Sequence, residues 1–314
     1  MARREMPDGG RRVIVLLNVG AGAADQKGTE QLEAALSEAF AAAAVEAELR
    51  FCTGEDLRLA AEAALAKASS GEVDAVVAGG GDGSISTVAG ILAGSNIPLG
   101  VLPLGTLNHF AKDLSIPTDL AGAVQVIAEG HARSIDLAEV NGEVFINNSS
   151  IGIYPYLVLD RDRRLAEHKM AKWIAMIPAF FRVMKHFPRR RLALSAEGWT
   201  RPYRTPCLFV GNNEYGMNLF TFGRRLHLDR GELSIDVVKQ RQPLAFFWMI
   251  VRLAFGDADN QRDIETFRVR EAVVQSRTSR LPVALDGEVQ FMHPPLHYRS
   301  RPRALCVLAP AAVS

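Results

Sequence analysis

The first half of the chain alternates short apolar runs with segments whose apolar residues recur at helical spacing. Leu32, Leu36 and Phe40, for example, lie four residues apart, as on one face of a helix. Strand, loop and helix in repeated succession are typical of a doubly wound α/β domain with a mostly parallel sheet. Ligands of such sheets bind at the carboxyl ends of the strands. Strands are predicted at 13–17, 49–52, 74–78, 98–102 and 133–140, and helices at 30–47, 57–68, 85–93 and 120–129.

Beyond residue 140, turns rather than helices separate most of the apolar runs. This pattern predicts an antiparallel β-sandwich. We therefore expect an N-terminal doubly wound α/β domain at 11–137 and a C-terminal antiparallel β-sandwich domain at 138–314, whose last strand is free to return to the first domain. The predicted strands are 144–148, 192–196, 207–211, 233–238, 267–274 and 304–308, with helical insertions at about 169–186 and 244–255.

Charge divides the chain at the same place. Residues 1–137 hold 10 Lys and Arg against 18 Asp and Glu, whereas residues 138–314 hold 26 against 17, although the whole chain carries only +1. The basic half could face nucleic acid, an anionic membrane or phosphate groups. The three cysteines show no disulfide or metal-ligand spacing, and the apolar runs fall short of the ~20 residues that span a bilayer. With no signal peptide recognised at the N-terminus, the cytoplasm is the expected compartment.

The strongest chemical signal is the stretch GGGDGS at 79–84, between a predicted strand and a predicted helix. Glycines let backbone N–H groups approach an anion, and the N-terminus of the following helix adds partial positive charge. The carboxylate of Asp82 is a suitable oxygen ligand for Mg²⁺. The stretch is neither a Walker A loop nor the dinucleotide-binding GxGxxG motif. A tight strand-to-helix turn is the alternative interpretation.

Two further glycine turns are predicted at the same edge of the sheet, NVGAG at 18–22 and LGTLNHF at 104–110. Either turn alone is weak support for a binding site, but three at one edge favour one. In the second half, Asp286-Gly287 predicts a hairpin turn between strands.

Taken together, GGGDGS, GTLNHFA at 105–111 and LDGE at 285–288 resemble the diacylglycerol kinase catalytic family, which includes bacterial lipid kinases and sphingosine kinases. The order and spacing of these motifs agree over 13–308. The resemblance implies a NAD-kinase-like first domain, ATP as phosphate donor and Mg²⁺. It assigns general-base catalysis to Glu288, with Asp286 beside it, and Mg²⁺ to Asp82, Asp136 and, more weakly, Asp229. It assigns ATP binding to Asn18, Gly20, Gly22, Thr53, Gly79, Gly80, Gly81, Asp82, Gly83, Ser84, Thr106 and Asn108.

The chain also departs from the family pattern. Val19 replaces a proline, and Ser84 replaces a threonine while keeping the hydroxyl. His109 stands where aspartate is usual, which removes a carboxylate from the family's aspartate–water–magnesium network. Arg230 likewise replaces an aspartate before Gly231, so a structural Mg²⁺ site there is expected to be lost or remodelled. Thr53 fits an N-cap of the next helix equally well.

The segment 169–191 is basic and aromatic, without acidic residues. It suits either an anionic lipid surface or the solvated face of a packed helix. Contacts with such a membrane would come from Lys169, Lys172, Arg189, Arg190 and Arg191.

We expect a lipid substrate and no nucleic acid partner, leave a homodimer open, and place the protein in the cytoplasm or at the inner membrane face. Diacylglycerol, a sphingoid base or another hydroxylated lipid would all suit the same carboxylate. One alternative is a NAD-kinase-like small-molecule kinase, because Asn213-Glu214 matches a pair found downstream in those enzymes. The other is a non-catalytic nucleotide- or lipid-binding regulator.

Overall fold

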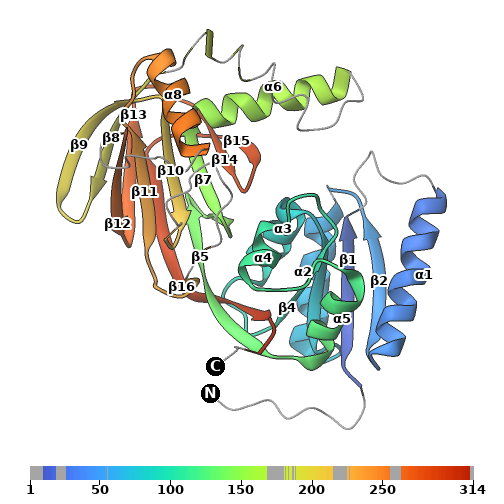
Figure 1. Cartoon of the computed structure of the whole chain (residues 1–314). Helices are drawn as coiled ribbons and strands as arrows, with labels where there is room; N and C mark the ends of the chain where they lie inside the picture. Colours follow the sequence, from blue (N-terminus) through green and yellow to red (C-terminus); the bar gives the residue numbers. More distant parts are fainter. Residues whose placement is uncertain are drawn as a thin grey trace. The chain divides into compact units, whose positions relative to one another are not determined.

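The structure, a computed structural model, describes residues 10–18, 26–54, 56–167, 189–214, 227–254 and 263–311, with 180, 182, 184, 185, 187 and 225. The chain forms two compact units, the first made of Met1–Ile135 with Arg303–Ser314 and the second of Asp136–Pro302. Two long strands, β5 (Ala132–Val140) and β16 (Leu296–Leu308), begin in one unit and end in the other (Figure 1).

The first unit is built on a parallel sheet in the order β2-β1-β3-β4-β16. Successive strands run parallel from β2 to β16, and β5 closes the edge against β16. Hydrogen bonds from Ala309 to His131 and from Asn141 to His297 show that β5 and β16 run in opposite directions. The other strands of the unit are β1 (Arg12–Asn18), β2 (Glu46–Cys52), β3 (Ala75–Gly80) and β4 (Leu99–Pro103).

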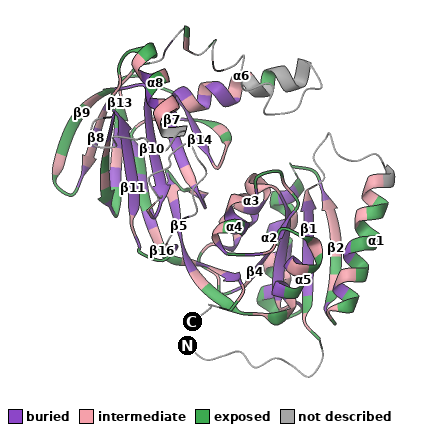
Figure 2. Ribbon diagram, viewed as in Figure 1, coloured by how far each residue is buried: buried purple, intermediate pink, exposed green. Residues whose placement is uncertain are grey.

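Helices cover both faces of this sheet, which explains why its central strands are apolar without alternation. Every residue of β3 is buried, and so is every residue of β4, which is labelled in Figure 2. Because β1 pairs with β2 on one side and β3 on the other, the direction of winding reverses between β1 and β3. The helices are α1 (Gln26–Ala42), α2 (Asp56–Ser70), α3 (Asp82–Leu92), α4 (His109–Asp113) and α5 (Leu120–Glu129).

The second unit is an antiparallel sandwich. One sheet has the order β12-β11-β10-β7-β14-β15, and the other contains β16-β13-β8-β9 with β5 and β6. Its elements are β6 (Glu143–Phe145), β7 (Asn148–Gly152), α6 (Ile153–Glu167), β8 (Arg190–Ala196), β9 (Trp199–Thr205), β10 (Cys207–Asn212), β11 (Leu233–Val238), α8 (Pro243–Ala254), β12 (Ile264–Val269), β13 (Glu271–Ser276), β14 (Leu281–Leu285) and β15 (Glu288–Met292).

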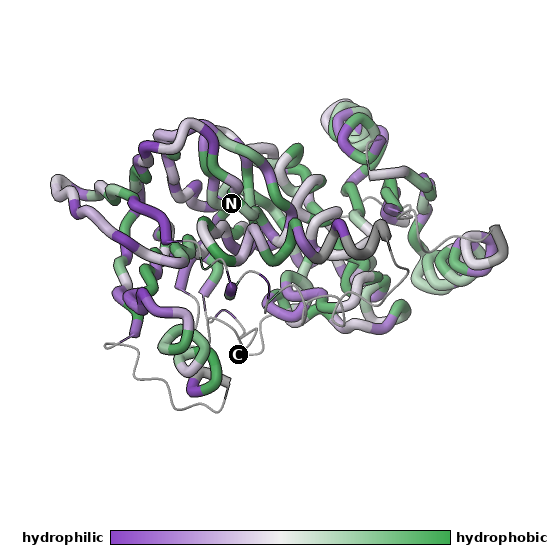
Figure 3. The backbone as a smooth tube through the Cα atoms, turned by 90° about the horizontal axis from the view of Figure 1, so that it is seen from above, coloured by the Kyte–Doolittle hydropathy of each residue, from purple (hydrophilic) through white to green (hydrophobic). Residues whose placement is uncertain are grey.

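The two sheets of the sandwich enclose one apolar core. Along the backbone, hydrophobic stretches alternate with hydrophilic ones (Figure 3). Tyr298 of β16 is buried there, contacts Phe145 edge-on at 6.4 Å between ring centroids, and shares a 3.1 Å hydrogen bond with the hydroxyl of Ser149 in the facing sheet. The predicted fold class, a doubly wound α/β domain followed by an antiparallel β-sandwich, is confirmed.

Several predicted element boundaries were wrong. The helix predicted to run to residue 47 ends at Ala42, because 43–45 turn into β2. The strand predicted at 144–148 is two strands, β6 and β7, and the one predicted at 267–274 is β12 and β13, which break at Arg270 and join different sheets. Helix α6 was not predicted, and most of the predicted helix at 169–186 lies outside the described residues. In the part of the chain that the structure describes, no helix is long and apolar enough to cross a bilayer.

Candidate functional site

The GGGDGS stretch forms the junction of β3 and α3, at the carboxyl edge of the sheet. Strand β3 ends at Gly80, Gly81 is the N-cap, and Asp82 begins the helix. Asn18, the last residue of the neighbouring β1, donates a 2.7 Å hydrogen bond from Nδ2 to Oγ of Ser84. The turn therefore lies where the winding of the sheet reverses, which is the preferred ligand position in open α/β sheets.

The three consecutive glycines differ in the space that is available for a side chain. A Cβ on Gly79 would lie 2.5 Å from Cδ2 of Leu17, and one on Gly80 would lie 2.9 Å from Cβ of Ser84, so a side chain at either position would displace a neighbouring side chain. A Cβ on Gly81 would meet nothing closer than Cα of Gly105, at 3.8 Å, and its φ of −85° suits any residue. Packing does not require glycine at 81, so its missing side chain leaves open space at the N-terminus of α3.

The second glycine turn packs directly against the first. A Cβ on Gly105 would lie 2.5 Å from Cα of Gly81. Asn108, in a left-handed conformation with φ of 51°, holds this turn together. Its Oδ1 accepts from the Gly105 N–H at 3.0 Å, and its Nδ2 donates to the carbonyls of Pro103 and Gly105 at 3.0 and 2.9 Å. Asn108 thus shapes the turn, whereas Thr106 is exposed on it.

The carboxylate of Asp82 ties the two turns together. Its Oδ2 accepts from the backbone N–H of His109 at 3.1 Å, and its Oδ1 from that of Phe110 at 3.0 Å. These donors are at the N-terminus of α4, where backbone N–H groups lack helical partners. Asp82 therefore has a structural role as well as the predicted role in binding Mg²⁺.

Thr53 follows β2 at the same edge of the sheet. Its hydroxyl donates to the carboxylate of Asp56 at 2.5 Å, and its carbonyl accepts from the Leu57 N–H at 3.0 Å. The carbonyl contact places Thr53 at the start of α2, as an N-cap would be, although within the described residues its hydroxyl donates to Asp56 and accepts no backbone N–H. Gly20 and Gly22, predicted to complete the edge after Asn18, lie outside the described residues.

All three cysteines are poorly suited to nucleophilic chemistry. Burial raises the pKa of the Cys52 thiol, and the nearby Asp56 carboxylate raises it further. Burial also raises the pKa of Cys207, to about 12, and that of Cys306. The thiolate is the reactive form, so none of the three is activated.

In the second unit, Asp136 is buried and holds a loop. Its backbone N–H donates to the carbonyl of Leu228 at 2.8 Å, and its Oδ2 accepts from the Gly231 N–H at 2.6 Å. Asp229 lies within the same loop. Arg230 points its guanidinium at Glu214, with 3.1 Å from Nη1 to Oε2. Among the described residues no three His, Cys, Asp or Glu side chains gather to hold a metal ion.

The LDGE motif is the hairpin turn between β14 and β15. Leu285 pairs with Glu288, and Asp286 and Gly287 have φ of 47° and 90°, the backbone form that favours Asp-Gly in two-residue hairpins. The Asp286 carboxylate accepts three backbone N–H groups of the β6–β7 connection, those of Ile146, Asn147 and Asn148, at 2.8, 2.8 and 3.0 Å. Glu288 is exposed. The two carboxylates are therefore in different environments.

A buried arginine also binds the connection between β6 and β7, through a carbonyl group and a side-chain amide. No sequence motif indicated this residue. Arg225, 4% exposed, donates to the carbonyl of Ile146 at 2.6 Å and to Oδ1 of Asn147 at 3.0 Å. Asn212 adds bonds from Nδ2 to the carbonyls of Ile146 and Asp136, both at 2.9 Å. Sequence reasoning missed Arg225 and Asn212, because contacts made with distant backbone groups leave no local pattern.

The predicted membrane-binding arginines have different environments. Arg189 is exposed, whereas Arg190 donates to the hydroxyl of Tyr156 and its guanidinium carbon lies 5.4 Å from the centre of that ring. Arg191 lines a groove on the outer face of β8. Lys169 and Lys172 lie outside the described residues.

The contrast between Gly81 and Gly105 predicts opposite effects of alanine. Gly81→Ala should keep the free energy of unfolding within about 0.5 kcal/mol of wild type, since its Cβ enters open space. Gly105→Ala should cost about 1–3 kcal/mol, because its Cβ overlaps backbone atoms that have no room to move. Denaturant unfolding of both variants tests this, and equal stabilities would contradict the close contact of the two turns.

A second prediction concerns Asp286. Asp286→Ala should lower the free energy of unfolding by roughly 2–4 kcal/mol, because three partly buried N–H groups lose their acceptor. Glu288→Ala, in the same hairpin but exposed, is the matched control and should change stability by less than about 0.5 kcal/mol. If the Asp286 variant is as stable as the control, the three hydrogen bonds do not hold the connection.

Comparisons with known proteins agree with this architecture. Residues 12–140 match the model of the diacylglycerol kinase catalytic domain. A diacylglycerol kinase of Staphylococcus aureus (strain Newman) is 44% identical over 81 residues, 25% of this chain and 26% of that protein. An uncharacterized protein of Synechocystis sp. is 25% identical over 249 residues, 77% of this chain and 56% of that protein. The chain therefore spans little more than half the length of one curated relative and about a quarter of the other.

Solved structures match over the entire chain. A Bacillus anthracis str. Sterne protein provisionally assigned as a diacylglycerol kinase aligns over 100% of both chains with a TM-score of 0.77 and 22% identity. A diacylglycerol kinase of the same strain aligns over 97% of this chain and 99% of its own, with a TM-score of 0.68 and 22% identity. At this identity the likeness establishes the fold. Through residues 12–140, this chain is similar to the diacylglycerol kinase catalytic domain.

Proposed function

We propose that this protein is a lipid kinase that transfers the γ-phosphate of ATP to the hydroxyl group of a lipid. The observation that carries the proposal is the open space at Gly81, at the N-terminus of α3 and at the reversal point of the sheet. Backbone N–H groups and the helix dipole make such a position favourable for phosphate. The family match over 12–140 supports the same assignment.

The nucleotide would be bound by the edge that Asn18, the 79–84 turn and the 105–108 turn form together. Gly81 lets the phosphates approach the backbone, and Ser84, fixed by Asn18, presents a hydroxyl nearby. Asp82 and Asn108 would act by holding the two turns in place. Thr106 is exposed on the second turn and would contact the nucleotide directly, whereas the Thr53 hydroxyl is already bound to Asp56 at the start of α2.

In the proposed reaction, Glu288 is the general base. The lipid hydroxyl gives its proton to the Glu288 carboxylate as its oxygen attacks the γ-phosphorus. The bond from that phosphorus to the β–γ bridging oxygen breaks, and ADP leaves with the electron pair. Asp286 would position the hairpin rather than take the proton, because its carboxylate already accepts three backbone hydrogen bonds.

Mg²⁺ would enter with the nucleotide and offset the charge of its phosphates. The described residues do not assemble a metal site of their own. Asp136 binds the Gly231 N–H directly, and the neighbouring Arg230 is cationic. This arrangement supports the expectation that the family's structural Mg²⁺ site is remodelled here, with Asp229 a poor substitute.

The alternative of a NAD-kinase-like activity finds no support in the Asn213-Glu214 pair. Asn213 is buried and accepts the backbone N–H of Arg230 at 3.1 Å. Glu214 forms ion pairs with Arg230 and Arg268. Both side chains therefore hold the second unit together. For the acceptor, we propose a diacylglycerol-like or sphingoid lipid, met by a cytoplasmic protein at the inner membrane face.

Nucleotide binding should depend on the open space at Gly81. Gly81→Val is expected to weaken ATP affinity roughly tenfold or more, a loss of at least about 1.4 kcal/mol, because its side chain would occupy the space left for phosphate. Calorimetric titration with a non-hydrolysable ATP analogue measures this. Retention of wild-type affinity in a folded Gly81→Val protein would place the phosphates elsewhere.

Catalysis should depend on the Glu288 carboxylate. Glu288→Gln keeps shape and polarity but removes the proton acceptor, so kcat should fall by roughly 10²–10⁴-fold. Its melting temperature and ATP affinity should match wild type, since Glu288 is exposed and lies outside the glycine turns. The measurement is transfer of labelled phosphate to lipid in detergent micelles. An unchanged kcat would reduce LDGE to a hairpin turn.

A further inference from the structure

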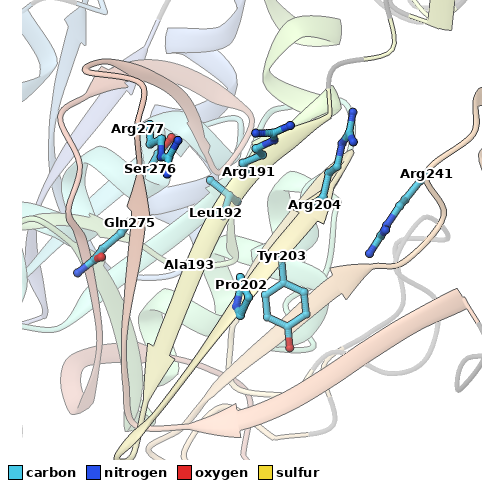
Figure 4. Close-up of a pocket in the computed structure, with 10 residues that line it drawn as sticks. All are labelled: Arg191, Leu192, Ala193, Pro202, Tyr203, Arg204, Arg241, Gln275, Ser276 and Arg277. Carbon is cyan, nitrogen blue, oxygen red and sulfur yellow. The ribbon is translucent and has the colours of Figure 1, made fainter.

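The outer face of one sandwich sheet carries a groove of about 600 Å³ between β13, β8 and β9 (Figure 4). Arg191 and Arg204 lie on neighbouring strands there, with Arg277 and Arg241 to either side. None of the described residues that line the groove is acidic. The lining residues are Arg191, Leu192, Ala193, Pro202, Tyr203, Arg204, Arg241, Gln275, Ser276 and Arg277.

Two of these arginines face each other directly. Arg191 of β8 is the register partner of Arg204 of β9, and directly paired residues share a face of the sheet. That face points outward, because Leu192 and Leu194 point into the core. Like charges directly opposite one another destabilise a sheet. An anion bound over the pair would offset the repulsion between the two guanidinium groups.

The other arginines of the groove add positive charge that no carboxylate among the described residues balances. All four arginines are exposed, and within the described ranges no ion pair to a carboxylate involves any of them. By contrast, Arg201 on the same strand β9 pairs with Glu265 at 3.0 Å. The groove therefore concentrates uncompensated positive charge in a recess, which favours a ligand with several negative charges.

An exposed apolar face begins next to the groove. Arg241 precedes α8 by two residues, and Leu244 and Trp248 of that helix are 67% and 53% exposed. Being four residues apart, they lie on one face of the helix. Arginine beside exposed leucine and tryptophan is the composition of surfaces that bind anionic lipid, with the cations at the phosphates and the apolar side chains at the acyl boundary.

We infer that the arginine groove, with Leu244 and Trp248, docks the second unit on an anionic phospholipid surface. This extends the proposed function by naming where the protein meets the bilayer that holds its acceptor. The docking surface shares Arg191 with the 169–191 segment, but its other residues come from β9, α8 and the chain next to β13 and α8. Its test measures binding and needs no catalysis, so it can fail while the kinase assignment stands, and the reverse.

The test is co-sedimentation of the full chain with phosphatidylcholine vesicles, with and without phosphatidylglycerol. Each arginine near an anionic surface contributes about fivefold in binding, so the double variant Arg191→Gln/Arg204→Gln should bind roughly 30-fold more weakly. The matched control Arg270→Gln/Arg280→Gln removes the same charge from exposed residues of the same unit outside the groove, and should bind like wild type. The groove variant should melt no lower than wild type, because it relieves a like-charge pair.

A second pair of variants tests the apolar part. Leu244→Ser should weaken vesicle binding several-fold, whereas Leu59→Ser, at an equally exposed leucine on α2 (67% for both), should not. Equal sedimentation of the groove double variant and its control would overturn the docking surface. So would binding of soluble glycerol phosphate or single-stranded RNA that the groove substitutions abolish while vesicle binding persists, because the groove would then serve a free anion or a nucleic acid.

Discussion

The close approach of two backbone turns, at Gly81 and Gly105, is the constraint on which the first unit depends. With 2.5 Å between a hypothetical Gly105 Cβ and the Gly81 Cα, the turns that follow β3 and β4 pack without any side chain between them. Asp82 reinforces the contact by accepting two N–H groups from the start of α4. Because the turns are held by each other, the outward side of Gly81 is left open. This open side is where the proposed function places the phosphates of the nucleotide.

In the second unit, buried and partly buried polar side chains hold the connection between β6 and β7. The connection between β6 and β7 changes direction between two strands. Asp286 accepts three of its N–H groups, and Arg225 and Asn212 both donate to its Ile146 carbonyl. Glu288, two residues after Asp286, begins β15 and is exposed to solvent. The separation of a structural carboxylate from a free one within a single short motif is what makes the general-base proposal specific to Glu288.

Much of this could be predicted from local pattern. The β–α alternation, the glycine turns and the Asp-Gly hairpin are local features, since spacing and backbone freedom determine them. What could not be predicted depends on long-range contacts. The break at 146–147 follows from a carboxylate about 140 residues away, and the exchange of sheets at Arg270 follows from partners chosen by the whole sandwich. The different surroundings of Gly79, Gly80 and Gly81 could not be predicted either, because a Cβ would meet neighbouring side chains at the first two and open space at the third.

The proposed function requires that the γ-phosphate of ATP is transferred to a lipid hydroxyl. Incubating the wild-type chain with γ-labelled ATP, Mg²⁺ and a lipid extract, and counting label in the organic phase against ADP formed, tests it most directly. One labelled phosphate in a lipid is expected for each ADP. ADP released without organic label, or label transferred to a water-soluble acceptor such as NAD, would contradict it.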